Sequence, residues 1–167
     1  LMEALSLPGT ISAVANAKSS TGRLDLLTRT ITDRGTEFDR IPAGYEGRLY
    51  AEICPRSFSV LVRPGMRLNQ IRFRDGQAVL SDAELKARHA ETPLVSGKAV
   101  ISDGLGFSVD LSPGPGGLVG FRAKPHTGVI DLDNIGHYSP VEFWERLETT
   151  EGRIILDPGA FYILVSQ

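Results

Sequence analysis

Three groups of polar side chains in the first half of this 167-residue chain have types and spacings that suit chemistry. The densest group reads Lys-Ser-Ser-Thr-Gly-Arg from Lys18 to Arg23 and places two cations around three hydroxyls and a glycine. A turn of this composition offers backbone N–H groups, hydroxyls and positive charge to one anion, as a polyphosphate requires. The residue order is not that of a P-loop. The alternative is a polar turn held by its own Ser and Thr side chains.

The second group lies on a predicted strand over residues 48–53. Strand alternation separates two faces, one with Arg48, Tyr50 and Glu52 and the other with Leu49, Ala51 and Ile53. A partly buried carboxylate at the end of such a strand is suited to act as a general base. The alternatives for Glu52 are a solvated strand face or a structural pair with a nearby arginine.

The third group follows a Pro-Gly turn at residues 64–65, where a predicted strand carries Gln70. The side-chain amide of Gln70 could read the edge of a pyrimidine. The chain has one cysteine, Cys54, and three histidines without ligand spacing. The signature of the zinc nucleobase deaminases is therefore missing, and we expect no bound zinc.

Composition excludes several classes of protein. The chain has 41% hydrophobic and 23% charged residues and a formal net charge of −2, which fits neither a basic nucleic-acid binder nor a disordered acidic tail. The apolar runs are shorter than the ~20 residues of a membrane-spanning helix. A single cysteine favours a reducing compartment, and we expect a cytoplasmic protein without nucleic-acid or membrane partners.

Short runs rich in β-branched and aromatic residues, bounded by Gly, Pro, Asp or Asn, predict strands. They cover residues 10–15, 24–32, 48–53, 57–62, 69–73, 98–101, 106–111, 119–122, 128–132, 154–156 and 161–166. Helices are predicted only at 81–88, after the N-cap candidate Ser81, and at 139–145, with Pro140 at the first helical position. This pattern indicates an all-β sandwich or barrel-like fold.

A boundary is predicted near residue 92, in a linker over residues 91–97. The sign of the net charge changes there: residues 1–92 carry 13 Lys/Arg and 11 Asp/Glu, a net +2, whereas residues 93–167 carry 5 and 9, a net −4. The chain begins at Leu1 without the features of a signal peptide, which is expected of a processed chain or of a fragment of a longer one.

The motifs of the first part, taken together and in order, resemble the dCTP deaminase branch of the trimeric dUTPase superfamily. The resemblance covers about residues 8–75. It rests on the motif at 18–23, on Asp39 with the Ala-Gly-Tyr-Glu-Gly turn at 43–47, on Tyr-Ala-Glu at 50–52, and on Pro-Gly-Met at 64–66 running to Gln70. The sequence departs from the family where Arg-Ile-Pro at 40–42 separates Asp39 from that turn.

The resemblance implies a role for each matching residue. Lys18, Ser19, Ser20, Thr21, Gly22 and Arg23 would hold the triphosphate, Asp39 would meet the sugar, and Tyr50, Ala51 and Gln70 would contact the base. Glu52 would activate the attacking water without a metal, with Ser19 and Arg23 close to the reacting ring. Magnesium would travel with the nucleotide.

In the second part, residues 106–111 and 157–164 resemble strands that precede the serine-arginine loop in this family. We therefore expect a dUTPase-like distorted β-barrel, of the β-clip type, with two short helices. Residues 1–92 would be the C-terminal part of a first repeat and 93–167 the N-terminal part of a second.

The activity implied by the resemblance is hydrolytic deamination of dCTP to dUTP in pyrimidine deoxynucleotide synthesis. The implied assembly is a homo-oligomer, trimer-like, with sites between subunits or repeats. Two alternatives stay open: a dUTP diphosphatase or bifunctional enzyme, which Tyr45 favours, and a non-catalytic nucleotide-binding or oligomerisation module.

Overall fold

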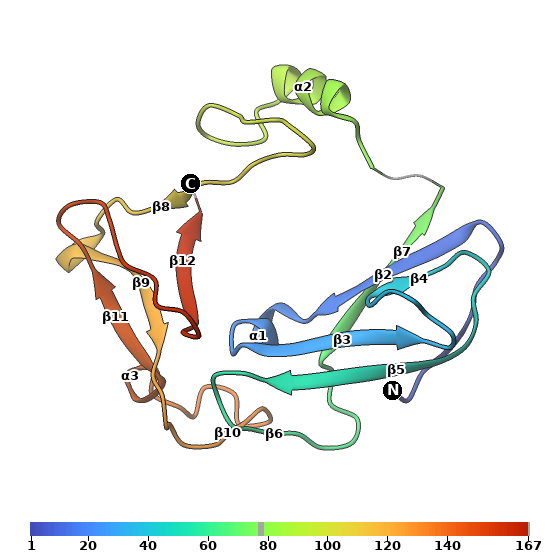
Figure 1. The fold of residues 1–167 in the computed structure, drawn as a ribbon, viewed down its shortest axis with the longest axis horizontal. Coiled ribbons are helices and arrows are strands. Elements are labelled where there is room, and N and C mark those ends of the chain that lie inside the picture. The colour runs from blue at the N-terminus through green and yellow to red at the C-terminus, as the bar shows by residue number, and fades with distance from the viewer. Residues whose placement is uncertain (77–78, 167) are drawn as a thin grey trace. The chain divides into compact units, whose positions relative to one another are not determined.

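The computed structural model describes residues 1–76 and 79–166, and these form two compact units, one of residues 1–78 with 124–143 and the other of residues 79–123 with 144–167. Strands dominate both units, so the expectation of an all-β fold is confirmed. The elements run in the order shown in Figure 1.

Most elements of the first unit come from the N-terminal half of the chain. They are β1 (Ala4–Ser6), β2 (Ile11–Ala17), α1 (Ser19–Gly22), β3 (Leu26–Thr32), β4 (Arg40–Ile41), β5 (Glu46–Pro55), β6 (Val60–Leu61) and β7 (Asn69–Asp75), together with β10 (Ile130–Asp131) and α3 (Pro140–Phe143). Two three-stranded sheets, ordered β1-β5-β3 and β4-β2-β7, provide the strands of this core.

The core of the first unit contains small and aliphatic side chains from both sheets. Ala13 of β2, Ile41 of β4 and Leu49 of β5 are at most 2% exposed and belong to one cluster with Tyr45. On β3 the buried face carries threonines 28, 30 and 32. The hydroxyl of Thr30 accepts a hydrogen bond of 2.6 Å from the amide of Asn69 in β7.

A segment from the second half of the chain, residues 124–143, completes the first unit. Its strand β10 pairs in parallel with β6. Phe143 packs edge-on against Phe58, with ring centroids 5.9 Å apart. Arg63 donates to both carboxylate oxygens of Asp131, at 2.6 and 2.7 Å, and to Asp133 at 3.0 Å. The guanidinium of Arg63 lowers the pKa of Asp131 to about 2.

The second unit contains α2 (Asp82–Glu91), β8 (Val109–Asp110), the short 3₁₀ helix η1 (Pro115–Gly117), β9 (Leu118–Ala123), β11 (Trp144–Glu148) and β12 (Tyr162–Ser166). Its four-stranded sheet is ordered β11-β9-β12-β8. The predicted cap of α2 is confirmed: Ser81 and Glu84 form a capping box, in which each side chain bonds the other residue's backbone N–H. This arrangement satisfies two backbone donors at the helix start.

Several elements differ from the prediction. The described residues hold three α-helices instead of two, because 18–23 is not a simple turn and includes α1. The predicted helix at 139–145 ends at Phe143, since Trp144 starts β11 in register with Ala123 of β9. Residues 154–156 lie outside any strand, and of 98–101 only Ile101 forms a bridge.

The predicted boundary near residue 92 and the division into parts of two repeats stay predictions. In the structure, α2 belongs to the second unit, and the first unit is built from two stretches of chain.

Candidate active site

The cationic segment at 18–23 is anchored by its one buried side chain. Lys18 and Arg23 flank the single turn of α1. At the start of the segment, the Lys18 amide donates a hydrogen bond of 2.8 Å to the Leu68 carbonyl. Thr21 is 5% exposed, and its hydroxyl donates to the carbonyls of Lys18 at 2.9 Å and Leu68 at 3.3 Å. The fold therefore uses Thr21 to fix the position of this segment beside the start of β7.

The other polar side chains of the same segment are free to bind. Lys18, Ser19, Ser20 and Arg23 are exposed. Within the residues that the structure describes, none of these four side chains has a hydrogen bond or an ion pair. A cationic turn held by one threonine, with its charges and hydroxyls unpartnered, can accept an anionic group.

Glu52 lies on β5 directly opposite Arg29 of β3, and the two side chains form an ion pair. The predicted alternation of β5 is confirmed at Leu49, which is 1% exposed, and at Tyr50, which is 47% exposed. Ile53 departs from the expected apolar face, because it lies near the end of the strand and is exposed. The side chain of Glu52 is 41% exposed, so its carboxylate is accessible to solvent.

The cationic segment directly precedes the start of β3 (Figure 1), whereas Glu52 pairs with Arg29 in the middle of the β3–β5 ladder. Strand β3 begins three residues after Arg23, and Arg29 is three residues further on, about 10 Å along the strand. The end of β5 is held beside the start of β3, because Asp25 accepts hydrogen bonds from the Arg56 amide at 3.1 Å and the Ser57 hydroxyl at 2.8 Å.

Gln70 lies beside the cationic segment because of the β2–β7 pairing. It is exposed and lies opposite Asn16, two residues before Lys18. The structure thus places Gln70 beside the cationic segment, and Glu52 on the other three-stranded sheet, in the middle of the β3–β5 ladder.

Asp39 has a structural task. Its Oδ1 accepts a hydrogen bond from the Thr30 amide at 2.8 Å, and its own amide donates to the Thr30 carbonyl at 2.9 Å. Its φ of 61° is a left-handed conformation that Asp tolerates better than most residues. The role implied for Asp39 at the sugar stays a prediction, and one oxygen of its carboxylate is already engaged.

Tyr45, which favoured the diphosphatase alternative, lies in the core. It is 8% exposed, and its hydroxyl donates to the Arg48 carbonyl and accepts from the Asp33 amide at 3.0 Å. A Cβ at position 47 would lie 2.8 Å from that hydroxyl, so Gly47 leaves the room that Tyr45 needs. Packing is sufficient to explain this tyrosine, and the diphosphatase alternative stays open.

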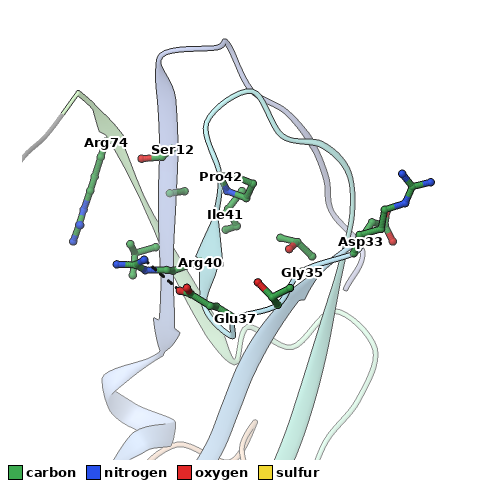
Figure 2. A pocket seen from close by; sticks show the side chains of 13 residues that line it. Ser12, Asp33, Gly35, Glu37, Arg40, Ile41, Pro42 and Arg74 are labelled. Atoms are coloured by element: carbon green, nitrogen blue, oxygen red, sulfur yellow. Dashed lines mark ion pairs between the residues drawn. The ribbon is translucent and has the colours of Figure 1, made fainter.

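A cavity of about 450 Å³ lies elsewhere in the first unit (Figure 2). Ile41 and Pro42 contribute to its wall, and Arg40 and Glu37 form an ion pair of 3.2 Å beside it. None of the predicted site residues, all of which the structure describes, lines this cavity.

Among residues 1–76 and 79–166, no group of three or more His, Cys, Asp and Glu side chains could hold a metal ion. The expectation of no zinc stays a prediction. No helix in the same ranges is long and apolar enough to cross a membrane.

Sequence reasoning did not identify Arg29 or Phe38. An arginine partner for Glu52 was among the alternatives, but only the register of β3 against β5 shows that it is Arg29. The guanidinium of Arg29 stacks over the ring of Phe38, 3.9 Å from its centroid. Identifying Arg29 and Phe38 from the sequence would have required the register of β3 against β5, which the local strand pattern does not contain.

Comparisons with known proteins match the whole chain to one kind of enzyme. Residues 1–77 match the model of the 2'-deoxycytidine 5'-triphosphate deaminase (DCD) N-terminal domain, and residues 81–167 match that of the C-terminal domain. The crystal structure of 2'-deoxycytidine 5'-triphosphate deaminase from Agrobacterium tumefaciens is 49% identical, with a TM-score of 0.92. The match covers 99% of this chain and 50% of that one, so the chain spans about half the length of this relative. No curated protein matches the chain.

Proposed function

Since the chain belongs to the 2'-deoxycytidine 5'-triphosphate deaminase family, we propose that it catalyses the hydrolytic deamination of dCTP. Water and dCTP give dUTP and ammonia. The observation that carries this proposal is the accessible carboxylate of Glu52 on β5, paired with the strand β3 that begins three residues after the exposed cation Arg23 of the 18–23 segment.

The triphosphate binds to the 18–23 segment. Lys18 and Arg23 supply positive charge, and Ser19 and Ser20 supply hydroxyl donors. Thr21 and Gly22 hold the turn in which these groups stand. Magnesium arrives as part of the nucleotide complex, because its preferred ligands include phosphate oxygens and water.

The base binds along the outer edge of β5. Strand β1 pairs only with residues 46–48 of β5, so the edge that continues past Tyr50 and Ala51 has no partner strand among the described residues. Unpaired backbone N–H and C=O groups at a strand edge can recognise the polar edge of a cytosine. Gln70 adds a side-chain amide, and Asp39 lies toward the sugar.

Glu52 performs the proton transfers. Its carboxylate takes a proton from water as the water oxygen bonds to C4 of cytosine, and the protonated carboxyl then gives that proton to the departing amine. The C–N bond breaks and ammonia leaves, and the C4 carbonyl of dUTP forms as the second proton of the former water passes to N3 of the ring. Ser19 and Arg23 stand near the ring and balance the charge that develops on it.

We propose further that the enzyme is cytoplasmic and works as a homo-oligomer, with sites between subunits or between repeats. This proposal follows from the family to which the chain belongs, whose N-terminal and C-terminal domain models both match it. No nucleic acid or membrane takes part.

The experiment that tests the function follows two products in one reaction. The protein is incubated with dCTP or dUTP and magnesium, and ammonia and pyrophosphate release are measured separately. Deamination predicts one ammonia for each dUTP formed from dCTP and no pyrophosphate. Pyrophosphate from dUTP would show a diphosphatase, and binding of either nucleotide without any product would show a non-catalytic module.

We also propose that the deamination does not require zinc. Protein treated with a chelator and returned to magnesium is expected to keep its full turnover and to contain less than one zinc per ten chains by elemental analysis, about the level of contamination. Stoichiometric zinc, together with loss of turnover on chelation, would revive the metal-dependent class of deaminase.

A further inference from the structure

Arg29 is held on two sides, by Glu52 and by Phe38. The pair to Glu52 joins Nη2 of Arg29 to Oε1 of Glu52 across the β3–β5 ladder. On its face, the guanidinium rests on the Phe38 ring at 3.9 Å from the centroid, a distance at which a cation and an aromatic ring attract. A long side chain with contacts of both kinds keeps one orientation.

Phe38 is itself fixed by its neighbour in the chain. Asp39 makes two hydrogen bonds with the backbone of Thr30, the residue after Arg29, and its carbonyl accepts from the Ala15 amide at 2.8 Å. The loop that carries Phe38 is thus fastened to β3 beside Arg29. Asp39, Phe38 and Arg29 form a continuous support that ends at the Glu52 carboxylate.

The support leaves one oxygen of Glu52 unused. Arg29 contacts Oε1, and Oε2 has no hydrogen-bond partner within the described residues. In addition, Nε of Arg29 is buried and has no acceptor in that part of the chain.

We propose that Arg29 is a positioning residue for the deamination: it fixes the rotation of the Glu52 carboxylate so that Oε2 is the oxygen that accepts the proton from water. This inference rests on the proposed function. A half-exposed ion pair on a strand contributes little to stability, so the pair is better explained by orientation than by folding.

The test uses Arg29→Met and Arg29→Lys in the intact protein. Methionine keeps an aliphatic stem over Phe38 but removes the charge and the hydrogen bond, so the variant folds. We expect kcat for dCTP to fall about 10- to 100-fold with KM within about threefold, because the proton acceptor is misplaced while the binding groups remain. Arg29→Lys should recover part of kcat, since it restores a cation beside Oε1.

A matched control is Arg88→Ala, which removes an exposed arginine–glutamate pair of α2 that has no part in the proposed site. It should leave kcat unchanged. In a Glu52→Gln background, Arg29→Met should cause no further loss, because the two residues act as one unit.

Four results overturn the inference. A kcat for Arg29→Met equal to that of Arg88→Ala would do so while leaving the function intact, and so would a change confined to KM. A fall in melting temperature that accounts for the loss, with no rescue by lysine, would show a structural pair. A wild-type protein that releases no ammonia from dCTP would overturn the function itself and this inference with it.

Discussion

Two of the arginine–carboxylate clusters in the first unit differ in how completely their hydrogen-bonding groups are satisfied. Arg63 donates two hydrogen bonds to the carboxylate of Asp131 and one to Asp133, at distances between 2.6 and 3.0 Å. The Asp131 side chain is only 18% exposed. Among the residues that the structure describes, Arg29 contacts a single oxygen of Glu52 and has no acceptor for its own Nε, and the Glu52 side chain is 41% exposed.

On the proposed function, this difference separates a structural task of Arg63 from a chemical task of Arg29. The Arg63 cluster connects residues about 70 positions apart and completes a unit made from two stretches of chain. The Arg29 pair connects two strands that a full ladder already joins, so the fold does not depend on it. We assign assembly to the saturated Arg63 cluster and, on the proposed function, orientation of the Glu52 carboxylate to the Arg29 pair.

The largest effect is expected from Glu52→Gln. Glutamine keeps the size of the side chain but cannot accept the proton, so turnover of dCTP should fall at least about 100-fold while dCTP affinity stays within a few-fold. Steady-state ammonia release and calorimetric titration measure the two quantities. Near-normal ammonia release by this variant would contradict the assignment of the proton transfers to Glu52.

Arg23→Ala tests whether the free cations of the 18–23 segment bind the triphosphate. A charge-assisted pair contributes on the order of 1.5–3 kcal/mol, so dCTP affinity should fall roughly 10- to 100-fold while deoxycytidine, which has no phosphate, is bound as before. The melting temperature should stay constant, because Arg23 is exposed and has no ion pair in the described residues. Equal losses for nucleotide and nucleoside would contradict the phosphate-binding role.

Arg63→Met tests whether the Arg63 cluster stabilises the fold. It removes the fork that holds residues 131–133 against the loop after β6, so the melting temperature should fall by at least about 3 °C. Turnover of dCTP at a temperature well below the transition should stay within about twofold of wild type. A variant that melts like wild type would show that β6–β10 pairing and the Phe58–Phe143 contact hold the segment without the arginine.

The smallest effect concerns pH. Arg63 lowers the pKa of Asp131 from its ordinary value of 3.8 to about 2, so this carboxylate stabilises the fold above about pH 4, and the contribution is lost as the pH falls toward 2. Urea unfolding of wild type and Arg63→Met at about pH 6, 4 and 3 should show a difference in unfolding free energy that is constant at the two higher values and smaller at the lowest. A difference that grows on acidification would contradict the assignment.

The strands that carry the proposed site were predictable from local pattern. Alternation over residues 48–53 placed Leu49 inward and Tyr50 outward because one face of that strand packs on a core. The capping box at Ser81 was predictable for a similar reason, since both of its residues lie within one helical turn.

Long-range pairing was not predictable in the same way. The strand β11 was missed because Pro140 and Glu142 give a helix start, whereas the pairing of Trp144 with Ala123 decides where the helix ends. The arginine partner of Glu52 depends on register, and the return of residues 124–143 to the first unit depends on contacts such as Phe58 with Phe143. These features arise from tertiary packing and leave no local signal.

The two arginines can be compared directly by measuring kcat for dCTP and the melting temperature of both Arg29→Met and Arg63→Met in the same preparations. A crossed result is predicted: Arg29→Met lowers kcat about 10- to 100-fold and leaves the melting temperature unchanged, whereas Arg63→Met lowers the melting temperature and leaves kcat unchanged. If both variants change the same quantity, the assignment of a positioning role to Arg29 and a structural role to Arg63 is wrong.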